Sequence, residues 1–248
     1  MRRREFISLL GGAAATLPGF TALAQRQMPL VGFLNSASPD TYRFNADSFR
    51  EGLAKAGFVE GRNVRIEERW ARGDYDALPA LAAELVAMGV VAIAATGDVA
   101  SARAAQRASG TVPVVFTIGG DPVRFGLVKS INRPGGNVTG ILFNQNVLGA
   151  KRIELLRQMP ANISRVALLM NPTNPNVKIE VADAEAGAKK LGSETVTLYA
   201  SNARELDAAL EQVLSAKADA FITGTDPILL DRREQIVSFA HRHKLPGV

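Results

Sequence analysis

Polar residues follow the predicted strands of this sequence at the points where the strands end. In the first half they are Asn35, Ser36, Thr96, Gly97, Gly119, Asp121 and Asn144, and in the second half they are Asn171, Thr173, Asn174, Thr225 and Asp226. Hydroxyl and amide side chains, with the free N–H groups of helix starts, form hydrogen bonds that suit a small polar ligand. The same residue types also build ordinary turns and N-caps. The chemistry expected is reversible binding, and the evidence is the group of loops rather than any single residue.

Asp121 carries the sharpest of these predictions. It follows the apolar run Val112–Thr117, after two glycines that let a ligand approach the backbone closely. Pro122 restricts Asp121 to an extended backbone, which favours an outward-held carboxylate. We predict that Asp121 orients a cationic group of the ligand. The alternative is that it caps a helix that begins at Val123.

Motifs of known catalytic and cofactor sites are missing from the sequence. The chain contains no cysteine, which excludes a thiolate nucleophile and cysteine-ligated metals. Its two histidines, His241 and His243, lie at a basic helix end, where contact with backbone carbonyls is the simpler role. Gly135–Gly140 precedes a strand and lacks the lysine of a phosphate-binding loop. Neither a dinucleotide fingerprint nor a nucleophile elbow occurs.

Three carboxylates near strand ends offer groups for acid–base work, namely Asp98, Asp121 and Asp226. Nothing in the sequence pairs them. We therefore expect a protein that is not an enzyme, with no catalytic residue, no cofactor and no metal site.

The charge pattern argues against nucleic-acid binding. The net charge is +5 for the 248 residues, and Arg2, Arg3 and Arg4 contribute to it. Beyond them the basic residues occur singly or in pairs, and aromatic residues make up only 6%. A nucleic-acid surface needs a basic stripe and benefits from stacking platforms. We expect a mildly basic, solvated surface.

The first 24 residues have the three-part layout of a secretory signal. A basic start is followed by an apolar stretch from Phe6 to Leu17 and then by Ala22-Leu23-Ala24, an A-x-A cleavage pattern. Arg3-Arg4-Glu5-Phe6-Ile7 also resembles a twin-arginine export signal. A cytosolic protein with a chance apolar start is the alternative. We expect residues 1–24 to be a signal peptide and the mature protein to be periplasmic.

The rest of the chain alternates short apolar runs with amphipathic stretches. The expected strands are Leu30–Leu34, Val64–Glu67, Val90–Ala95, Val112–Thr117, Val138–Leu142, Arg165–Met170, Glu194–Tyr199 and Ala218–Thr223. The expected helices include Phe49–Ala56, Leu78–Val86 with Asp76 as its cap, Ala100–Ala108, Val123–Ile131, Leu148–Met159, Val177–Leu191, Ala203–Leu214 and Ile228–Lys244. Strict alternation predicts an α/β fold with parallel strands covered on both faces.

Two such series suggest two lobes of similar design. We expect an N-terminal lobe over residues 28–143 and a C-terminal lobe over residues 147–248. The segment Lys244–Val248 resembles Thr111–Val115, a helix exit that leads into a buried strand. From this likeness we expect a strand that is cut off, and hence an incomplete second lobe.

The leader Arg2–Leu10, Val31–Ser36, Glu60–Val64, Asp121–Gly140 and Asn171–Asn174 together carry a resemblance over essentially the whole chain. The sequence resembles the ABC-transporter substrate-binding family whose characterised relatives take tryptophan or other aromatic amino acids. The resemblance implies a type I periplasmic-binding fold, in which two Rossmann-like lobes close on a ligand between them.

The resemblance also implies roles for individual residues. Thr96 and Gly97 match the helix-start turn that receives the anionic end of a ligand, and Asp121 matches a turn where a carboxylate meets an ammonium group. Asn171, Thr173 and Asn174 match the facing loop of the other lobe, and Thr225-Asp226 its second loop. Asn35–Asp40 differs from the loop of relatives specific for aromatic amino acids.

These observations predict a periplasmic solute-binding component of an ABC uptake transporter. It would bind a small polar organic ligand, such as an amino acid, by hinge closure, as a monomer with a permease as its partner. A ligand-sensing subunit for a membrane receptor kinase is the alternative with the same fold. An exported α/β enzyme is the third reading.

Mass spectrometry of a periplasmic extract tests the predicted signal. We expect a new N-terminus near Gln25, because cleavage follows the Ala22-Leu23-Ala24 pattern. Replacing Arg3 and Arg4 with lysine should impair export through the twin-arginine pathway. Unaffected export would indicate the general pathway, and an intact Met1 in the extract would contradict the signal itself.

Overall fold

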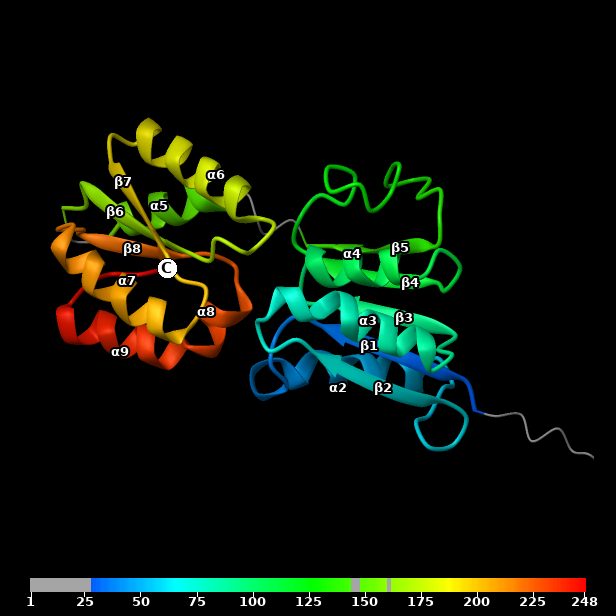
Figure 1. Cartoon of the computed structure of the whole chain (residues 1–248). Helices are drawn as coiled ribbons and strands as arrows, with labels where there is room; N and C mark the ends of the chain where they lie inside the picture. The colour runs from blue at the N-terminus through cyan, green and yellow to red at the C-terminus, as the bar shows by residue number, and fades with distance from the viewer. Residues whose placement is uncertain (1–27, 144–147, 160–161) are drawn as a thin grey trace, which may run out of the picture.

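The structure, a computed structural model, describes residues 28–143, 148–159 and 162–248. The predicted signal peptide and Asn144 lie outside the described residues. The elements form two parallel α/β units, which we call the first lobe (β1 to β5) and the second lobe (α5 to Val248) (Figure 1). The predicted α/β class with parallel strands is confirmed.

The first lobe contains a five-stranded parallel sheet in the order β2-β1-β3-β4-β5. Its strands are β1 Leu30–Asn35, β2 Arg65–Trp70, β3 Ala92–Thr96, β4 Val114–Ile118 and β5 Val138–Leu142. Its helices are α2 Pro39–Lys55, the 3₁₀ turn Tyr75–Ala77, α3 Leu78–Ala87 and α4 Val99–Ala108. From β1 the chain adds β2 on one side and then crosses to the other side to add β3, β4 and β5. The order of strand addition therefore changes direction between the neighbouring strands β1 and β3.

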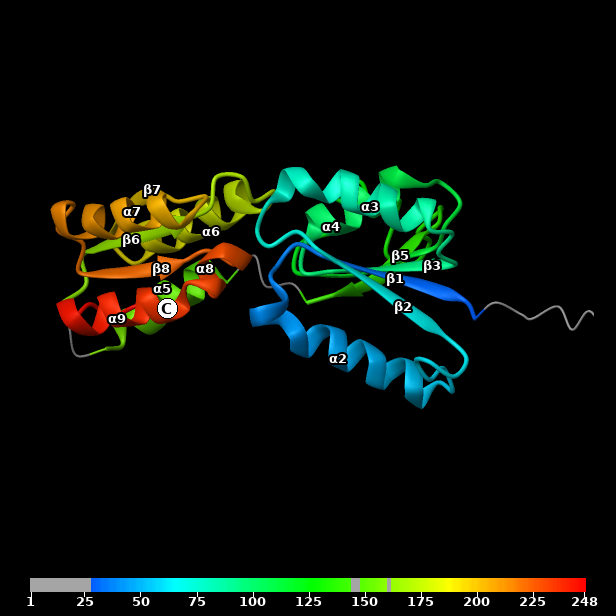
Figure 2. The ribbon, with the colours of Figure 1, turned by 60° about the horizontal axis from the view of Figure 1, so that its bottom comes forward.

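The alternation of side chains along each strand assigns the helices to the two faces of this sheet. Leu34 and Phe116 belong to the core beneath α3 and α4, while Phe33 packs with Phe49 of α2 on the other face (Figure 2). α2 covers the β1–β3 part of its face. Val115 of β4, which points to that same side, is 46% exposed.

The second lobe contains a three-stranded parallel sheet in the order β7-β6-β8. Its elements are α5 Gly149–Arg157, β6 Arg165–Met170, α6 Val177–Lys190, β7 Glu194–Tyr199, α7 Ala203–Ser215, β8 Ala220–Thr223, α8 Pro227–Asp231 and α9 Arg233–His243. α5 and α6 pack on one face, and α7 and α9 on the other. Beyond α9, the Val248 N–H donates to the carbonyl of Phe221 at 3.1 Å, so the last residues form an isolated parallel bridge with β8.

Three local predictions were wrong. Val123–Ile131 is not a helix: the Phe125 N–H reaches the Asp121 carbonyl, but Gly126 adopts φ +69° and ends the turn. The helix expected over Ile228–Lys244 is interrupted at Arg232 into α8 and α9.

The third error concerns the start of α3. Asp76 does not cap it. Instead the Asp74 carboxylate accepts the Asp76 N–H at 3.0 Å, and a 3₁₀ turn leads into the helix.

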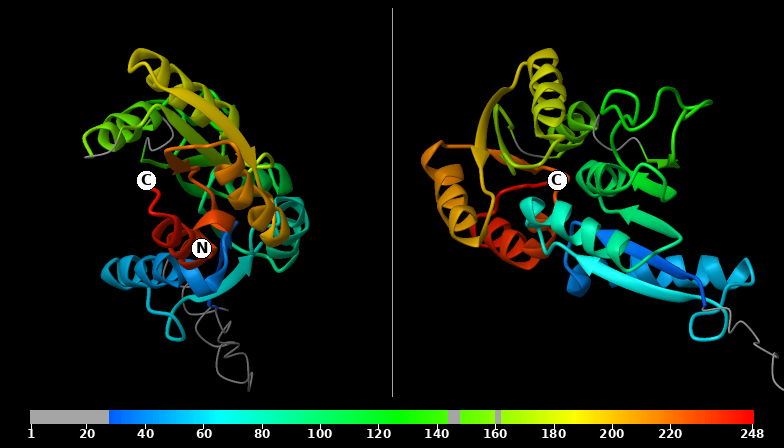
Figure 3. Two further views of the ribbon diagram at one scale, coloured as in Figure 1. Left: turned by 90° about the vertical axis from the view of Figure 1, so that its left-hand side faces the viewer. Right: turned by 45° about the vertical axis from the view of Figure 1, so that its right-hand side comes forward.

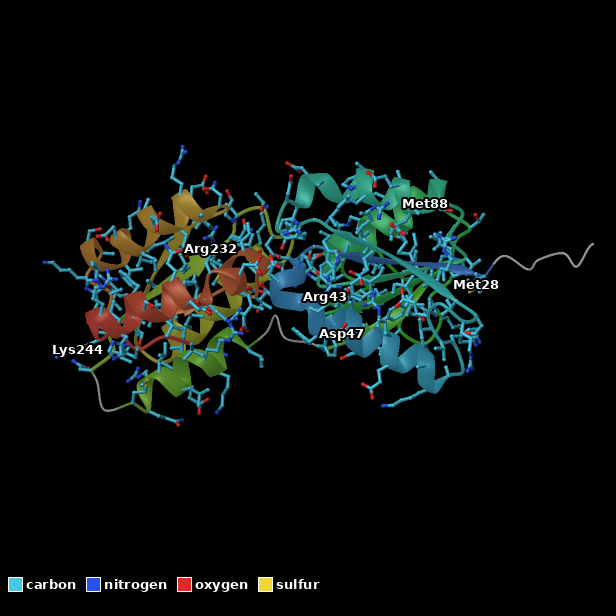
Figure 4. All side chains as sticks on the ribbon, turned by 90° about the horizontal axis from the view of Figure 1, so that it is seen from below. Met28, Arg43, Asp47, Met88, Arg232 and Lys244 are labelled. Atoms are coloured by element: carbon cyan, nitrogen blue, oxygen red, sulfur yellow. The ribbon has the colours of Figure 1, made fainter. Side chains whose placement is uncertain are left out.

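The two lobes lie side by side (Figures 1 and 3). Met28 lies at the outer end of the first lobe and Lys244 at the outer end of the second (Figure 4). The carboxyl ends of β1 and β3 point toward the second lobe, which is where sheets of this topology hold their ligands.

Packing between α5 and α6 requires glycine at position 187. A Cβ there would lie 2.4 Å from the Cα of Ala150. We expect Gly187→Ala to lower the free energy of unfolding by about 1–3 kcal/mol, because backbone cannot move aside as a flexible side chain does. Urea unfolding measures this.

Gly52→Ala is the matched control. Gly52 also lies inside a helix, but a Cβ at this position would have no atom within 4 Å. This variant should be neutral or gain up to about 1 kcal/mol. Equal stabilities of the two variants would contradict the packing argument.

Candidate functional site

In the first lobe, polar side chains gather where β1 and β3 end. The Asn35 amide donates to the Thr96 hydroxyl at 2.8 Å, and its oxygen accepts the Ala37 N–H at 2.7 Å. Both side chains are buried. β1 and β3 are adjacent strands on either side of the chain reversal, so the topology brings residues 61 positions apart into contact.

Gly97 lets these two strand ends approach each other. It adopts φ +98°, and a Cβ would lie 2.8 Å from the Ser36 hydroxyl and 2.9 Å from the Asn35 amide oxygen. A side chain would therefore displace the two polar groups. Asp98 follows, and its Oδ1 accepts the Ser101 N–H at 2.9 Å as the N-cap of α4.

In the second lobe, the loops after β6 and β8 converge on Asp226. Its Oδ2 accepts the amide groups of Asn171 at 3.1 Å and Asn174 at 2.9 Å, and its Oδ1 accepts the Ile228 N–H at 2.9 Å as the cap of α8. All three polar side chains are buried. β6 is the central strand and β8 its neighbour, so this cluster also lies where adjacent parallel strands end.

The two lobes are joined by hydrogen bonds across their boundary. The Tyr75 hydroxyl of the first lobe donates to Asp226 Oδ2 at 3.0 Å, and the Thr41 hydroxyl donates to Asp231. A Cβ at Gly73 would lie 2.5 Å from Ile228. In the view from below, Arg43 and Arg232 lie on opposite sides of this boundary (Figure 4).

A cavity of about 630 Å³ opens between the lobes. Its lining combines first-lobe residues, among them Ser38, Thr41 and Tyr75, with second-lobe residues, among them Thr173, Asn202 and Ile228. A larger, apolar cavity of about 920 Å³ runs along β8 and α9, and its lining includes Tyr42 and Asp226. We place the site at the interlobe cavity, because loops of both lobes line it; among the residues that the sequence singled out, Thr173 belongs to this lining.

Buried acidic groups dominate the electrostatics of this region. Burial raises the pKa of Asp98, the negative charge of Asp226 raises it further, and nearby Ser36, Ser101 and Tyr75 partly oppose the shift. Burial and the two carboxylates also raise the pKa of Tyr42 to about 12 and that of Tyr75 well above its usual value. Both phenols are therefore neutral hydrogen-bond donors near pH 7.

The structure brings together most of the residues that the sequence singled out. Asn35, Ser36, Thr96 and Gly97 form the first-lobe cluster, while Asn171, Asn174 and Asp226 form the second. Thr173 donates to Asn171 Oδ1 and lines the interlobe cavity, and the Thr225 N–H donates to Glu180. Their contacts with a ligand stay predictions.

Asp121 and Gly119 belong to neither polar cluster, and like most residues of those clusters they do not line either cavity. Asp121 is exposed, and its Oδ1 accepts the N–H groups of Val123 at 2.9 Å and Arg124 at 3.3 Å. These are capping bonds, although the segment they cap is a single turn. Of the three carboxylates that the sequence singled out, Asp98 and Asp226 are the two that are buried, and each affects the other across the boundary between the lobes.

Sequence reasoning missed the roles of Asp98, Tyr42 and Tyr75 in this region. Asp98 was noted only as an unpaired carboxylate, yet it ends the Thr96-Gly97-Asp98 turn at the β3 end. The tyrosines lie in or just before helices, and no spacing rule connects them with residues more than 100 positions away. The hydrogen bond of Tyr75 to Asp226, and the effect of the Asp226 charge on the pKa of Tyr42, arise only when the lobes meet.

None of the helices in the described part of the chain combines the length and the apolar character that a membrane crossing requires.

Comparison with known proteins identifies relatives of this chain. The "Tyrosine-binding protein" of Clostridioides difficile (strain R20291) is 28% identical over 204 residues, or 81% of this chain. The chain spans 58% of the length of that curated relative.

Two solved structures share the fold. A Streptococcus pneumonia ABC domain in complex with L-Trp has a TM-score of 0.77 at 24% identity, and a conserved domain protein from Vibrio cholerae has 0.80 at 23%. Each comparison covers 89% of this chain and 73% of the other. A family described as "ABC transporter substrate binding protein" matches residues 31–248. The chain therefore belongs to the ABC transporter substrate-binding protein family.

Proposed function

We propose that this protein is the exported binding component of an ABC uptake transporter and holds an amino acid between its two lobes. The observation that carries the proposal is the convergence of buried polar side chains from both sets of strand ends on one interlobe region. Family membership supports the class of protein. The relatives named for tyrosine and for L-Trp support an amino acid as the ligand, and an aromatic amino acid in particular.

Binding in this proposal is coupled to closure of the lobes. Tyr75 and Asp226 come from different lobes, so their hydrogen bond forms only when the lobes are together. A ligand that contacts both clusters favours the closed arrangement by its additional affinity for that state. The closed form then presents its ligand to the permease, and no bond of the ligand is made or broken.

A thermal-shift screen of the protein against the common L-amino acids and simple organic acids tests the proposal. At a ligand concentration about 100 times Kd, binding stabilises the folded state by about 2.7 kcal/mol. For a chain of this size, that corresponds to a rise in Tm of roughly 5–10 °C. The aromatic L-amino acids should give the largest rise. A screen in which no compound raises Tm would contradict the proposal.

Uptake of the same amino acid tests the proposed partner. A strain that lacks the gene should lose high-affinity uptake of the radiolabelled compound. Binding that survives in vitro, with uptake unchanged in the deletion strain, would favour a sensing role instead.

Removing the interlobe hydrogen bond should weaken binding. We expect Tyr75→Phe to raise Kd about three- to tenfold, because a hydrogen bond to a charged group contributes about 1 kcal/mol or more to the closed state. Titration calorimetry gives the affinity. Tyr199→Phe is the control, because the Tyr199 side chain is exposed on β7. Equal affinities of the two variants would contradict the claim that the Tyr75 hydroxyl stabilises the closed arrangement.

A further inference from the structure

The loop that follows β8, residues 223–226, carries Asp226 to the boundary between the lobes (Figure 1). Between β8 and α8 its backbone groups must find partners outside regular secondary structure. The Gly224 N–H donates to the Leu169 carbonyl of β6 at 2.8 Å, and the Thr225 carbonyl accepts the side-chain amide of Asn174 at 3.1 Å. Two further partners come from α5 and α6, the helices on one face of the sheet.

Arg152 of α5 and Glu180 of α6 bind this β8 loop on either side of Gly224. The Arg152 guanidinium donates to the Thr223 carbonyl at 2.9 Å. Oε2 of Glu180 accepts the Thr225 N–H at 2.9 Å. Gly224 leaves room for this contact, because a Cβ there would lie 3.2 Å from Oε2 of Glu180. Two side chains of opposite charge, from different helices, therefore hold the backbone of the loop at successive positions.

The buried position of Glu180 is unfavourable for a carboxylate. The residue is 8% exposed, and its Oε1 accepts no hydrogen bond from the described residues. Burial raises the pKa of its carboxyl, and the Thr225 N–H and the Arg152 charge oppose that shift only in part. Stability is then lost as the pH rises from the unfolded pKa through the folded pKa, so the ionised form disfavours folding. A buried carboxylate that lowers stability points to another role.

The β8 loop carries a contact that joins the lobes. Directly after Thr225, the Asp226 carboxylate accepts the Tyr75 hydroxyl of the first lobe at 3.0 Å. Hydrogen bonds weaken steeply when their geometry is distorted, so this contact depends on where the loop holds Asp226. Glu180 is not among the residues that line the interlobe cavity. Its route to the closed arrangement therefore runs through the loop.

We propose that Glu180, with Arg152, is a positioning residue for closure of the lobes: it holds the β8 loop so that Asp226 meets Tyr75. This inference rests on the proposed function and adds a residue that acts on ligand affinity without touching the ligand. Its contacts with the loop lie within the second lobe, so they order the loop before the lobes close. Preorganisation of this kind raises affinity by reducing the ordering that binding requires.

A double-variant comparison tests the inference. Glu180→Ala and Tyr75→Phe should each raise Kd for L-tyrosine or L-tryptophan about three- to tenfold in titration calorimetry, since each removes a hydrogen bond on the same route. In the double variant, Kd should stay close to that of the weaker-binding single variant. Residues that act through one contact are not additive, whereas two unrelated losses multiply.

Three further variants complete the design. Glu180→Gln should recover most of the affinity lost in Glu180→Ala, because its amide oxygen still accepts the Thr225 N–H. Its Tm without ligand at pH 7 should equal or exceed that of the wild type, because the buried charge is gone. Glu185→Ala, at an exposed position of α6, should change neither quantity. Arg152→Met takes the place of Glu180→Ala in the comparison if that variant proves poorly folded.

The outcomes separate this inference from the proposed function. The inference is wrong if Glu180→Ala binds as tightly as the wild type, if its effect persists in full in the Tyr75→Phe background, or if Glu180→Gln recovers nothing. In each of these cases the wild type still binds an amino acid, and the proposed function stands. If no amino acid raises the Tm of the wild type, the proposed function itself fails.

Discussion

Asp98 and Asp226 come from different lobes and lie close enough for the charge of one to raise the pKa of the other. Burial of two like charges is costly, and the surrounding residues offset part of that cost by donating hydrogen bonds to the carboxylates. Both oxygens of Asp226 accept hydrogen bonds. Oδ2 accepts them from Asn171, Asn174 and Tyr75, and Oδ1 accepts the N–H at the start of α8. Around Asp98 the Ser101 N–H donates to one oxygen, and the nearby hydroxyl groups of Ser36 and Tyr75 act against the rise in pKa that burial causes.

The sheet topology explains why these groups meet. In each lobe the polar residues follow two neighbouring parallel strands, β1 and β3 or β6 and β8, whose carboxyl ends share one edge. The loops at those edges start helices α4 and α8, so Asp98 and Asp226 serve as N-caps as well as site residues. Capping holds one oxygen of each carboxylate toward its helix, and the other oxygen of Asp226 accepts the Tyr75 hydroxyl of the first lobe.

The prediction from sequence succeeded where local rules apply. Alternating apolar runs and amphipathic stretches identified every strand of both sheets to within a few residues. This worked because the pattern of apolar and polar residues that marks a buried strand or an amphipathic helix is contained in a short stretch of sequence. It failed at Val123–Ile131, where apolar spacing resembles a helix but the left-handed Gly126 ends it after one turn. It also chose Asp121 over Asp98, because Gly-Gly-Asp-Pro is the more distinctive pattern, although the structure uses it as a cap.

The sequence by itself determined the α/β class, the strand ends and the polar residue types that follow them, since each depends on residues that are close together in the chain. Only the tertiary structure decided which of those residues face one another. The contact of Tyr75 with Asp226 spans 151 positions, and no periodicity encodes it. The surroundings of the buried Asp98 carboxyl are likewise decided by the tertiary structure, because Ser36, Tyr75 and Asp226, which affect its pKa, come from separate chain segments.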